Sequence, residues 1–372
     1  MILIILIAFF SLIALIIFHE LGHFLVAKYF GVKVEEFGIF LPPRLIGKKI
    51  GETVYSLNLL PFGAFVKLYG EEGGGVENIR SFSGKPIWQR VLIVIGGVAA
   101  FWIVAAFLFS IVFGIGARVP VTDETGHDLI DPRVQIWKVA SVSPAELAGI
   151  KTGDVIRQFK INNQQLTINK VKEVQELTDA HRGKEITLVI ERGEEFFDIS
   201  LVPRISPPEG EGAMGVALQR IATVIEKHFW YQAPIQGILY SGKLTGEIIQ
   251  GLAKILGDIF QKREIPPEAE PAGLLGITMF LAMATQFGLG FFLYFVGTIA
   301  IFVAIFNLLP LPALDGGKLL FLAIEKIRAK PISPKIEQNI TAICFILLIA
   351  LMIFVTIKFD IPRFSEFLNG RF

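Results

Sequence analysis

An uncharged apolar segment opens the chain and ends at a group of ionisable residues. Residues 1–18 carry no charge, and His19, Glu20 and His23 follow as an H-E-x-x-H motif. About 20 apolar residues suffice for a membrane-spanning helix, so the motif is expected inside one. Positions i and i+4 share a helix face, which lets the two histidines hold one metal ion together. Glu20 projects beside them, where it can take a proton from a metal-bound water.

The surroundings of the motif indicate whether the match is a coincidence or marks a functional site. An H-E-x-x-H match alone occurs in many proteins by coincidence, and on a soluble helix it indicates little. Ionisable side chains at membrane depth are energetically costly, so their presence there indicates a functional site. We therefore expect a metal-dependent hydrolase that works within the membrane.

Composition limits the alternatives. The 372 residues are 53% hydrophobic with a mean hydropathy of +0.60, which indicates a membrane protein, while the 19% of charged residues require a part outside the membrane. A net charge of +1 argues against a nucleic-acid partner. The single cysteine, Cys344, excludes an internal disulfide and a thiolate metal site.

Four segments meet the length expected of a membrane span, which makes membrane lipid an expected partner. They lie at residues 1–30, 88–117, 288–309 and 336–357. Residues 272–314 carry no charge and are too many for one helix, so an interfacial or re-entrant piece is expected before the third span.

Basic residues predict how these spans are oriented. Lysines and arginines recur in the loops at 31–87 and 315–335, which the positive-inside tendency assigns to the cytoplasm. Four spans then leave both termini and residues 118–230 on the outside. The first and third spans both descend, so their inner ends are expected at a similar depth.

The regions between the spans show three local patterns. Two β-rich runs around Pro61-Phe62-Gly63-Ala64 predict a hairpin over residues 53–69, unusually apolar for a cytoplasmic loop. A compact soluble domain is expected over 119–203. An amphipathic helix is expected over 235–262, with its apolar face suited to the membrane surface.

The soluble domain contains a clear helix start. Ser143 is expected to cap a helix, with Pro144 in the first helical position and Glu146 completing a capping box. A second helix is expected at 169–180. Two strands joined by a tight turn are expected at 186–191 and 196–202.

A catalytic zinc usually takes three protein ligands and keeps one position for water. Asp315 is the best-placed carboxylate for the third ligand, because the expected topology puts it at the same membrane end as the histidines. Two prolines before it let the chain bend, and two glycines after it allow close approach. Asn307 is expected to hydrogen-bond the substrate backbone or its polarised carbonyl oxygen. The alternatives are a helix cap at Asp315 and a helix–helix hydrogen bond at Asn307.

Two segments together carry a family resemblance. The pairing of F-H-E-L-G-H at 18–23 with N-L-L-P-L-P-A-L-D-G-G at 307–317 resembles the site-2 protease family of intramembrane zinc metalloproteases. The likeness is greatest to the bacterial sigma-E-pathway regulator proteases. Residues 143–154 resemble the PDZ signature of that group, and Tyr55–Glu71 resembles its membrane re-entrant β-hairpin.

The resemblance implies a fold and a set of roles. The implied fold is mainly α, with four transmembrane helices, a membrane-associated β-hairpin and an inserted α+β PDZ domain. His19, His23 and Asp315 would bind Zn²⁺, Glu20 would be the catalytic base, and Asn307 a contact to the substrate or transition state. The implied location is a bacterial inner membrane, with the active site towards the cytoplasm and the PDZ domain outside.

Four regions follow from this organisation. The first two spans with the motif and hairpin take residues 1–118, and a single PDZ domain takes 119–203. A linker with the interfacial helix takes 204–271, and the last two spans take 272–372. The chain departs from the group in two ways, because the group often has two PDZ units and often has Gly-Pro-x-x-Asn where this chain reads Gly96–Phe101.

The expected reaction is cleavage of peptide bonds within single-span membrane proteins, after a first cleavage has removed an outer domain. The hairpin could offer an edge strand to the unwound substrate. The PDZ unit could filter substrates by size, or bind a peptide or C-terminus. A non-catalytic PDZ-bearing adaptor is the alternative, and the presence of Glu20 argues against it. A transporter is a third candidate, but such proteins tend to show inverted repeats, and none is evident.

Overall fold

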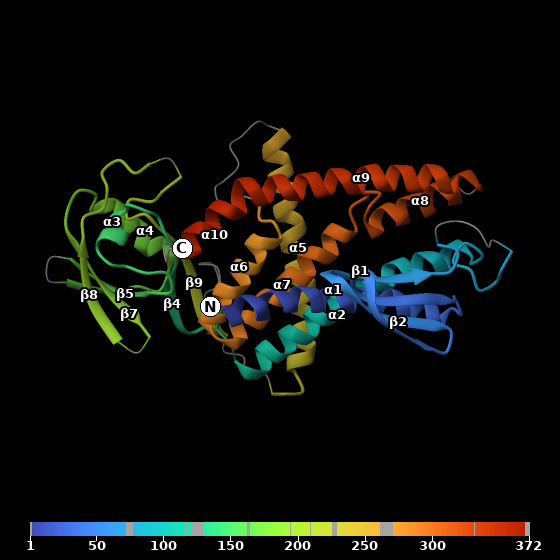
Figure 1. Ribbon diagram of the computed structural model, residues 1–372. Helices are drawn as coiled ribbons and strands as arrows, with labels where there is room; N and C mark the ends of the chain where they lie inside the picture. Colours follow the sequence, from blue (N-terminus) through green and yellow to red (C-terminus); the bar gives the residue numbers. More distant parts are fainter. Residues whose placement is uncertain are drawn as a thin grey trace. The chain divides into compact units, whose positions relative to one another are not determined.

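The computed structural model forms two compact units that interleave along the chain (Figure 1). The first comprises residues 1–110, 234–256 and 295–354, and the second comprises 111–233, 257–294 and 355–372. The residues that the structure describes are 2–71, 77–116, 118–120, 129–161, 164–193, 195–208, 210–224, 229–260, 271–330 and 332–368.

Within the described part of the chain, four helices are long and apolar enough to cross a membrane, which confirms the four spans expected from the sequence. They are α1 (Ile2–Tyr29), α2 (Ile87–Ile115), α7 (Leu289–Asn307) and α9 (Pro334–Val355). A short apolar helix, α6 (Leu274–Ala284), and the 3₁₀ turn η2 (Thr285–Phe287) precede α7, where an additional membrane piece was expected. The last helix continues through a π-helical turn, η3 (Thr356–Asp360), into α10 (Ile361–Leu368).

The hairpin expected within 53–69 is wrong in its turn and in its partner. β2 (Thr53–Leu68) runs through the Pro61–Ala64 stretch and pairs with β1 (Val34–Ile50), a segment not predicted as a strand. The tight turn lies at Gly51-Glu52, where Ile50 pairs with Thr53. The Pro61–Ala64 stretch has the composition of a turn, but it forms a bend with Gly63 at a φ of 145°.

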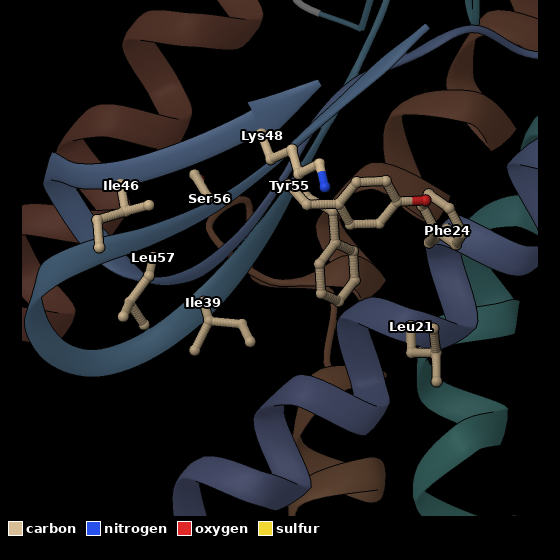
Figure 2. A pocket seen from close by; sticks show the side chains of 9 residues that line it. Leu21, Phe24, Ile39, Ile46, Lys48, Tyr55, Ser56 and Leu57 are labelled. Atoms are coloured by element: carbon tan, nitrogen blue, oxygen red, sulfur yellow. The ribbon is translucent and has the colours of Figure 1, made fainter. Parts of the chain in front are cut away.

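Both strands bend, so each residue near the start of β1 has two neighbours. Phe37 pairs with Val66 on one side and with Tyr55 on the other. The later part of β1 pairs with β2 on one side, as Ile46 does with Leu57 (Figure 2). These strands pack on α1, and a buried apolar cluster joins them to α1, α2 and α8 (Asp315–Arg328).

α1 and α2 approach each other closely because glycines line their contact. A Cβ atom added at Gly22 would lie 2.3 Å from the carbonyl oxygen of Gly96. Small residues allow this backbone contact between membrane helices. α5 (Ala233–Phe260) also packs on α2, where Trp102 Nε1 donates to Thr245 Oγ1 at 3.0 Å and Tyr240 contacts Phe109 edge-on.

α5 falls where the interfacial helix was expected, although its place at a membrane surface stays a prediction. The expected helix continued to residue 262, and residues 261–270 lie outside the described part of the chain.

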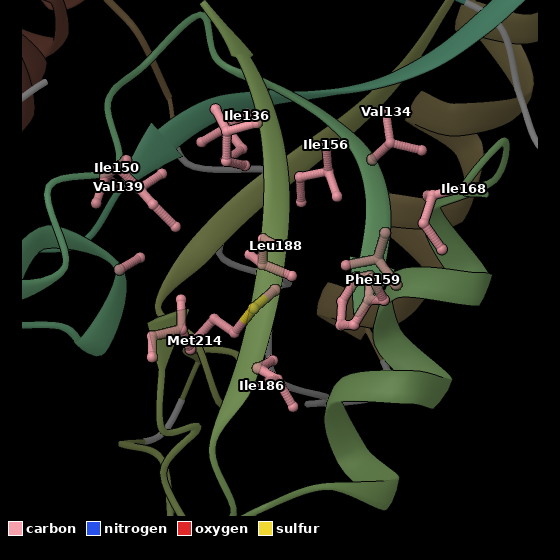
Figure 3. Close-up of a cluster of buried hydrophobic side chains, with 14 residues drawn as sticks. Val134, Ile136, Val139, Ile150, Ile156, Phe159, Ile168, Ile186, Leu188 and Met214 are labelled. Atoms are coloured by element: carbon pink, nitrogen blue, oxygen red, sulfur yellow. The ribbon is translucent and has the colours of Figure 1, made fainter. Parts of the chain in front are cut away.

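The second unit contains an antiparallel sheet in the order β3-β9-β4-β5-β7-β8, with β6 paired to β5. Its strands are β3 (Arg118–Pro120), β4 (Leu129–Val139), β5 (Val155–Ile161), β6 (Gln164–Thr167), β7 (Ile186–Arg192), β8 (Glu195–Leu201) and β9 (Val216–Val224). The helices α3 (Pro144–Leu147) and α4 (Val171–Ala180) accompany it. Figure 3 shows the apolar side chains between sheet and helices, among them Ile136, Phe159 and Leu188, which are fully buried.

The local predictions in this unit are confirmed. Ser143 caps α3 by accepting a hydrogen bond from the Glu146 backbone, and Glu146 Oε2 accepts one from Val142 N–H. α4, β7 and β8 lie within a few residues of their expected places. The sheet continues past the boundary expected at residue 203, because β9 returns to pair with β3 and β4.

Candidate metal centre

Three side chains from two distant segments meet at one point in the first unit. His19 and His23 project from one face of α1, and Asp315 is the first residue of α8. The Nε2 atoms of the histidines are 3.2 Å apart, and Asp315 Oδ2 lies 3.3 Å from His19 Nε2 and 3.4 Å from His23 Nε2. The structure thus brings together the three residues expected to bind a metal.

The orientation of each imidazole is set by α2. His23 Nδ1 is 2.9 Å from the carbonyl oxygen of Ile93, and a carbonyl can only accept, so Nδ1 carries the proton. The proton on Nδ1 leaves the Nε2 lone pair free for a metal. His19 stacks on Phe101, with ring centroids 4.7 Å apart and planes 18° from parallel.

Gly97 provides the space that the His23 ring occupies. A Cβ atom added at Gly97 would lie 2.1 Å from His23 Nε2. Any larger residue at this position would therefore displace the imidazole. Gly97 belongs to the stretch where the chain departs from the Gly-Pro-x-x-Asn pattern, and its role was not predicted from sequence.

Asp315 is not a helix cap. The residue before it, Leu314, is the N-cap of α8, and no side chain caps this helix. Asp315 Oδ2 is buried and makes no hydrogen bond to any described residue. One oxygen of the Asp315 side chain is thus available as a ligand.

The glycines after Asp315 let the preceding loop fold back over the start of α8. A Cβ atom at Gly316 would lie 2.1 Å from the carbonyl oxygen of Leu309, and one at Gly317 would lie 2.3 Å from that of Leu311. This confirms the close approach expected at Gly316-Gly317. It also explains how the turn after α7 delivers the carboxylate to α1.

The donor set fits zinc. Tetrahedral zinc with bonds of about 2.0–2.2 Å to imidazole nitrogen and carboxylate oxygen holds its ligand atoms roughly 3.3–3.6 Å apart. The three atoms here are separated by 3.2, 3.3 and 3.4 Å. Two neutral imidazoles and one carboxylate form a ligand set common in catalytic zinc sites, with a fourth position left for water or substrate.

Glu20 lies beside this group and not in it. Glu20 interacts electrostatically with His23 and Asp315, and no described residue forms an ion pair with it. Asn307 is the last residue of α7, and its side chain makes no hydrogen bond within the described part of the chain. The alternative of a helix–helix hydrogen bond at Asn307 has no support among those residues.

Ion pairs hold the helix that carries Asp315. Arg90 of α2 makes a two-point contact with Glu325, at 2.5 and 3.0 Å. Lys318, one turn after Asp315, forms an ion pair with Glu71 beyond the end of β2. These ion pairs were not predictable from the sequence, because nothing in the local pattern links residues so far apart.

An H-E-x-x-H helix long and apolar enough to span a membrane, completed by a carboxylate from a second segment, defines a membrane-embedded metallohydrolase. Comparison with known proteins gives the family. Residues 7–351 match the model of peptidase family M50, the site-2 protease family. The chain belongs to this family and is a zinc metalloprotease.

Relatives match along nearly the whole chain. A protein of Clostridium perfringens whose name includes the words zinc metalloprotease is 32% identical over 93% of this chain and 95% of its own length. One from Clostridium acetobutylicum, with the same words in its name, is 32% identical over 92% of this chain and 93% of its own length. The zinc metalloprotease RasP of Geobacillus kaustophilus is 27% identical over 94% of this chain and 96% of its own length.

Proposed function

We propose that the chain is an intramembrane endopeptidase that cleaves peptide bonds within the transmembrane segments of single-span proteins. The observation that carries this proposal is the meeting of His19, His23 and Asp315 within 3.4 Å on segments of an apolar helical unit. The two histidines lie in a helix with a mean hydropathy of 2.6, which is typical of a membrane span and not of a soluble protease. A first cleavage outside the membrane would precede this one, as in regulated intramembrane proteolysis.

In this proposal His19, His23 and Asp315 hold the zinc ion. When bound, zinc would act as a Lewis acid and would lower the pKa of a water molecule to about 7. Glu20 would accept a proton from the attacking water and deliver it to the leaving amine. Asn307 hydrogen-bonds the substrate backbone or the carbonyl oxygen that gains charge.

The β1–β2 sheet would receive the substrate near the membrane. Several apolar side chains on it are exposed, including Ile46 at 69%, Ile50 at 58% and Leu59 at 51%. A water-facing sheet rarely exposes so many, so contact with lipid or with substrate is favoured. An unwound substrate would gain backbone hydrogen bonds by adding to the sheet edge, since a helix must open before hydrolysis.

The sheet of the second unit would act as a PDZ domain on the outer side. Support comes from the capped helix α3 and from a cavity of about 790 Å³ between β9, α4 and the 210–215 loop. β3 pairs only with residues 221–223 of β9, so the first part of β9 has one edge unpaired among the described residues. Such an edge suits an added peptide or C-terminus, and the domain's bulk suits a size filter.

The proposed orientation places the metal centre towards the cytoplasm of a bacterial cell and the second unit outside. It rests on the basic residues of the 31–87 and 315–335 loops. In a Cys344→Ser background, a Lys160→Cys variant should react with an impermeant thiol reagent in intact cells. A Lys330→Cys variant should be protected, and the reverse pattern would overturn the orientation.

The decisive test of the activity is the Glu20→Gln variant assayed on a model transmembrane peptide. It should keep stoichiometric zinc and lose roughly 10²–10⁴-fold in cleavage rate, the usual contribution of a general base. Glu247→Gln is the matched control, because Glu247 is an exposed residue of α5 that pairs with Lys243 and with no other described residue. Normal turnover by Glu20→Gln would remove Glu20 from the mechanism. A wild-type enzyme that cuts only soluble loops would refute intramembrane cleavage.

A further inference from the structure

The two helices that carry the metal ligands are also connected outside the metal centre. His19 and His23 lie on α1, and Asp315 is the first residue of α8. The two helices are far apart in the sequence, so tertiary contacts must set the distance between them. The ion pair between Glu71 and Lys318 lies on one route that connects them.

The Asp315 side chain depends on its helix for its position. Its Oδ2 atom is buried and has no hydrogen-bond partner among the described residues, and it lies beside the two imidazoles with which it would share a metal. The helix α8 also begins without a hydrogen bond from a capping side chain. The contacts that fix the first turn of α8 therefore decide where the carboxylate lies.

Lys318 makes a charged contact from this first turn. It lies three residues after Asp315, and residues at i and i+3 are neighbours on the surface of a helix. Its Nζ atom donates a hydrogen bond to Glu71 Oε1 within the ion pair. The ion pair of Glu325 with Arg90 also holds α8, but it lies about two helical turns further along.

Glu71 is itself fixed at the end of β2. Its Oε2 atom accepts a hydrogen bond from Leu68 N–H at 3.3 Å, and its own N–H donates to the Leu68 carbonyl oxygen at 3.2 Å. Leu68 is buried, in the same apolar cluster as Leu322 of α8. The carboxylate of Glu71 thus has one oxygen bonded to the strand and the other to Lys318.

The segment that contains Glu71 is tied to the end of α1. Tyr69 N–H donates to the Lys33 carbonyl oxygen at 2.9 Å, and Val32 N–H donates to the Ala27 carbonyl oxygen at 2.9 Å. Ala27 belongs to α1 and lies one turn after His23. A continuous path of short contacts therefore leads from the helix of the histidines to the first turn of α8.

The charge of Lys318 has an effect opposite to that of its contact. Lys318 interacts electrostatically with Glu20 and with Asp315. A fixed ammonium group near the ligands repels a divalent cation, so its charge alone weakens zinc binding. If Lys318 nevertheless favours zinc binding, the benefit must come from the ion pair that it makes. The sign of its effect on zinc affinity therefore separates the two roles.

We propose that Lys318 is a positioning residue for the zinc site, whose ion pair with Glu71 holds the start of α8 where Asp315 can share a metal with His19 and His23. Lys318 acts through the backbone of α8 in this role. The inference concerns the metal site alone, so it does not depend on which substrate the enzyme cleaves.

The test measures zinc binding to the full-length protein in a buffered free-zinc series, without substrate. Lys318→Met should weaken zinc binding by roughly 10–100-fold, the usual cost of removing a group that orients a metal ligand. Lys318→Arg should recover most of that affinity, because a guanidinium also pairs with a carboxylate. Zinc affinity in Lys318→Met equal to or above that of the wild type would overturn the proposal, and so would a loss in Lys318→Arg as large as in Lys318→Met.

Lys326→Met is the matched control. It makes the same change at an exposed lysine further along the same helix. It should bind zinc as the wild type does. A loss as large as that in Lys318→Met would overturn the proposal, because the position of the lysine would then make no difference.

The other half of the ion pair provides a second, nearly isosteric variant, which tests the pair even if Lys318→Met does not fold. Glu71→Gln should weaken zinc binding, and wild-type affinity in this variant would overturn the proposal. The double variant Lys318→Met/Glu71→Gln should bind zinc no more weakly than the weaker of the two single variants, because both remove the same interaction. Additive losses would indicate two independent effects and would overturn the pairing. None of these results bears on intramembrane cleavage, which the Glu20→Gln assay tests separately.

Discussion

Replacing Gly97 by alanine tests whether the packing of α2 sets the geometry of the metal ligands. The new Cβ would lie 2.1 Å from His23 Nε2, 2.3 Å from Cε1 and 2.6 Å from Cδ2, whereas ordinary contact begins at 3.4 Å. The imidazole must then move by more than about 1 Å. Ligand distances in a working metal site are held to within about 0.2 Å, so His23 is lost as a ligand.

The size of the effect follows from the loss of one ligand in three. Removal of an outer-shell partner alone costs about 10–100-fold in metal affinity, so loss of a direct ligand should cost at least about 100-fold. That ratio corresponds to roughly 2.8 kcal/mol in binding free energy. Alanine is also the better helix former, by up to about 1 kcal/mol, so the helix itself should persist.

Zinc binding to Gly97→Ala should be measured in buffered free-zinc series, together with cleavage of a model peptide. Gly114→Ala is the control, because it makes the same change in the same helix and its Cβ would meet only Ala233, at 3.7 Å. We expect the control to bind zinc and cleave as the wild type does. Wild-type zinc affinity in Gly97→Ala would refute the argument that Gly97 makes room for the ring.

Four further outcomes are expected. Asp315→Ala should lose zinc at concentrations where the wild type is saturated, and chelation of the wild type should abolish cleavage that added zinc restores. Arg90→Met should lower the free energy of unfolding of the helical unit by about 3–5 kcal/mol, because it leaves the charge of Glu325 without its partner. Adding Glu325→Leu should recover part of that loss, as measured by thermal unfolding. Asp154→Asn should destabilise the second unit by roughly 1.5–3 kcal/mol in denaturant unfolding, since the buried carboxylate holds Arg192 through two charge-assisted hydrogen bonds at 2.7 and 2.8 Å.

The contact of Asp154 with Arg192 also affects the pKa of the arginine side chain. The hydrogen bond from Arg192 to Asp154 raises the pKa of the arginine above its already high usual value. The raised pKa means that this contribution to stability is complete at all ordinary pH values and is lost only in strong base.

The metal centre was largely predictable because its signals are compact. The spacing of His19 and His23 encodes a shared helix face, and Asp315 is a carboxylate beside an apolar span with glycines that permit close approach. The groups that orient these ligands were not predictable. The carbonyl of Ile93, which orients His23, has no sequence signature, because every residue has a carbonyl.

The prediction of the strand pairing was wrong for a related reason. Pro61–Ala64 has turn composition, and nothing local distinguishes a hairpin turn from a bend within a longer strand. The strand β1 carries Glu35 and Glu36 near its start, which masked its β pattern. Glu36 is accommodated because Arg44 and Ser56 hydrogen-bond its carboxylate, contacts that exist only after the two strands have paired.

Sequence alone determined the features that depend on residues close along the chain. The apolar helices, the face shared by the two histidines and the capped start of α3 follow from hydrogen bonds and side-chain spacings that span three or four residues. Tertiary structure decided where distant segments meet, including the partner of β2, the arrival of Asp315 at the imidazoles and the closeness of Gly97 to His23. The physical reason is that periodicity specifies which face of an element is buried, whereas distances between elements are set by the packing of complete surfaces.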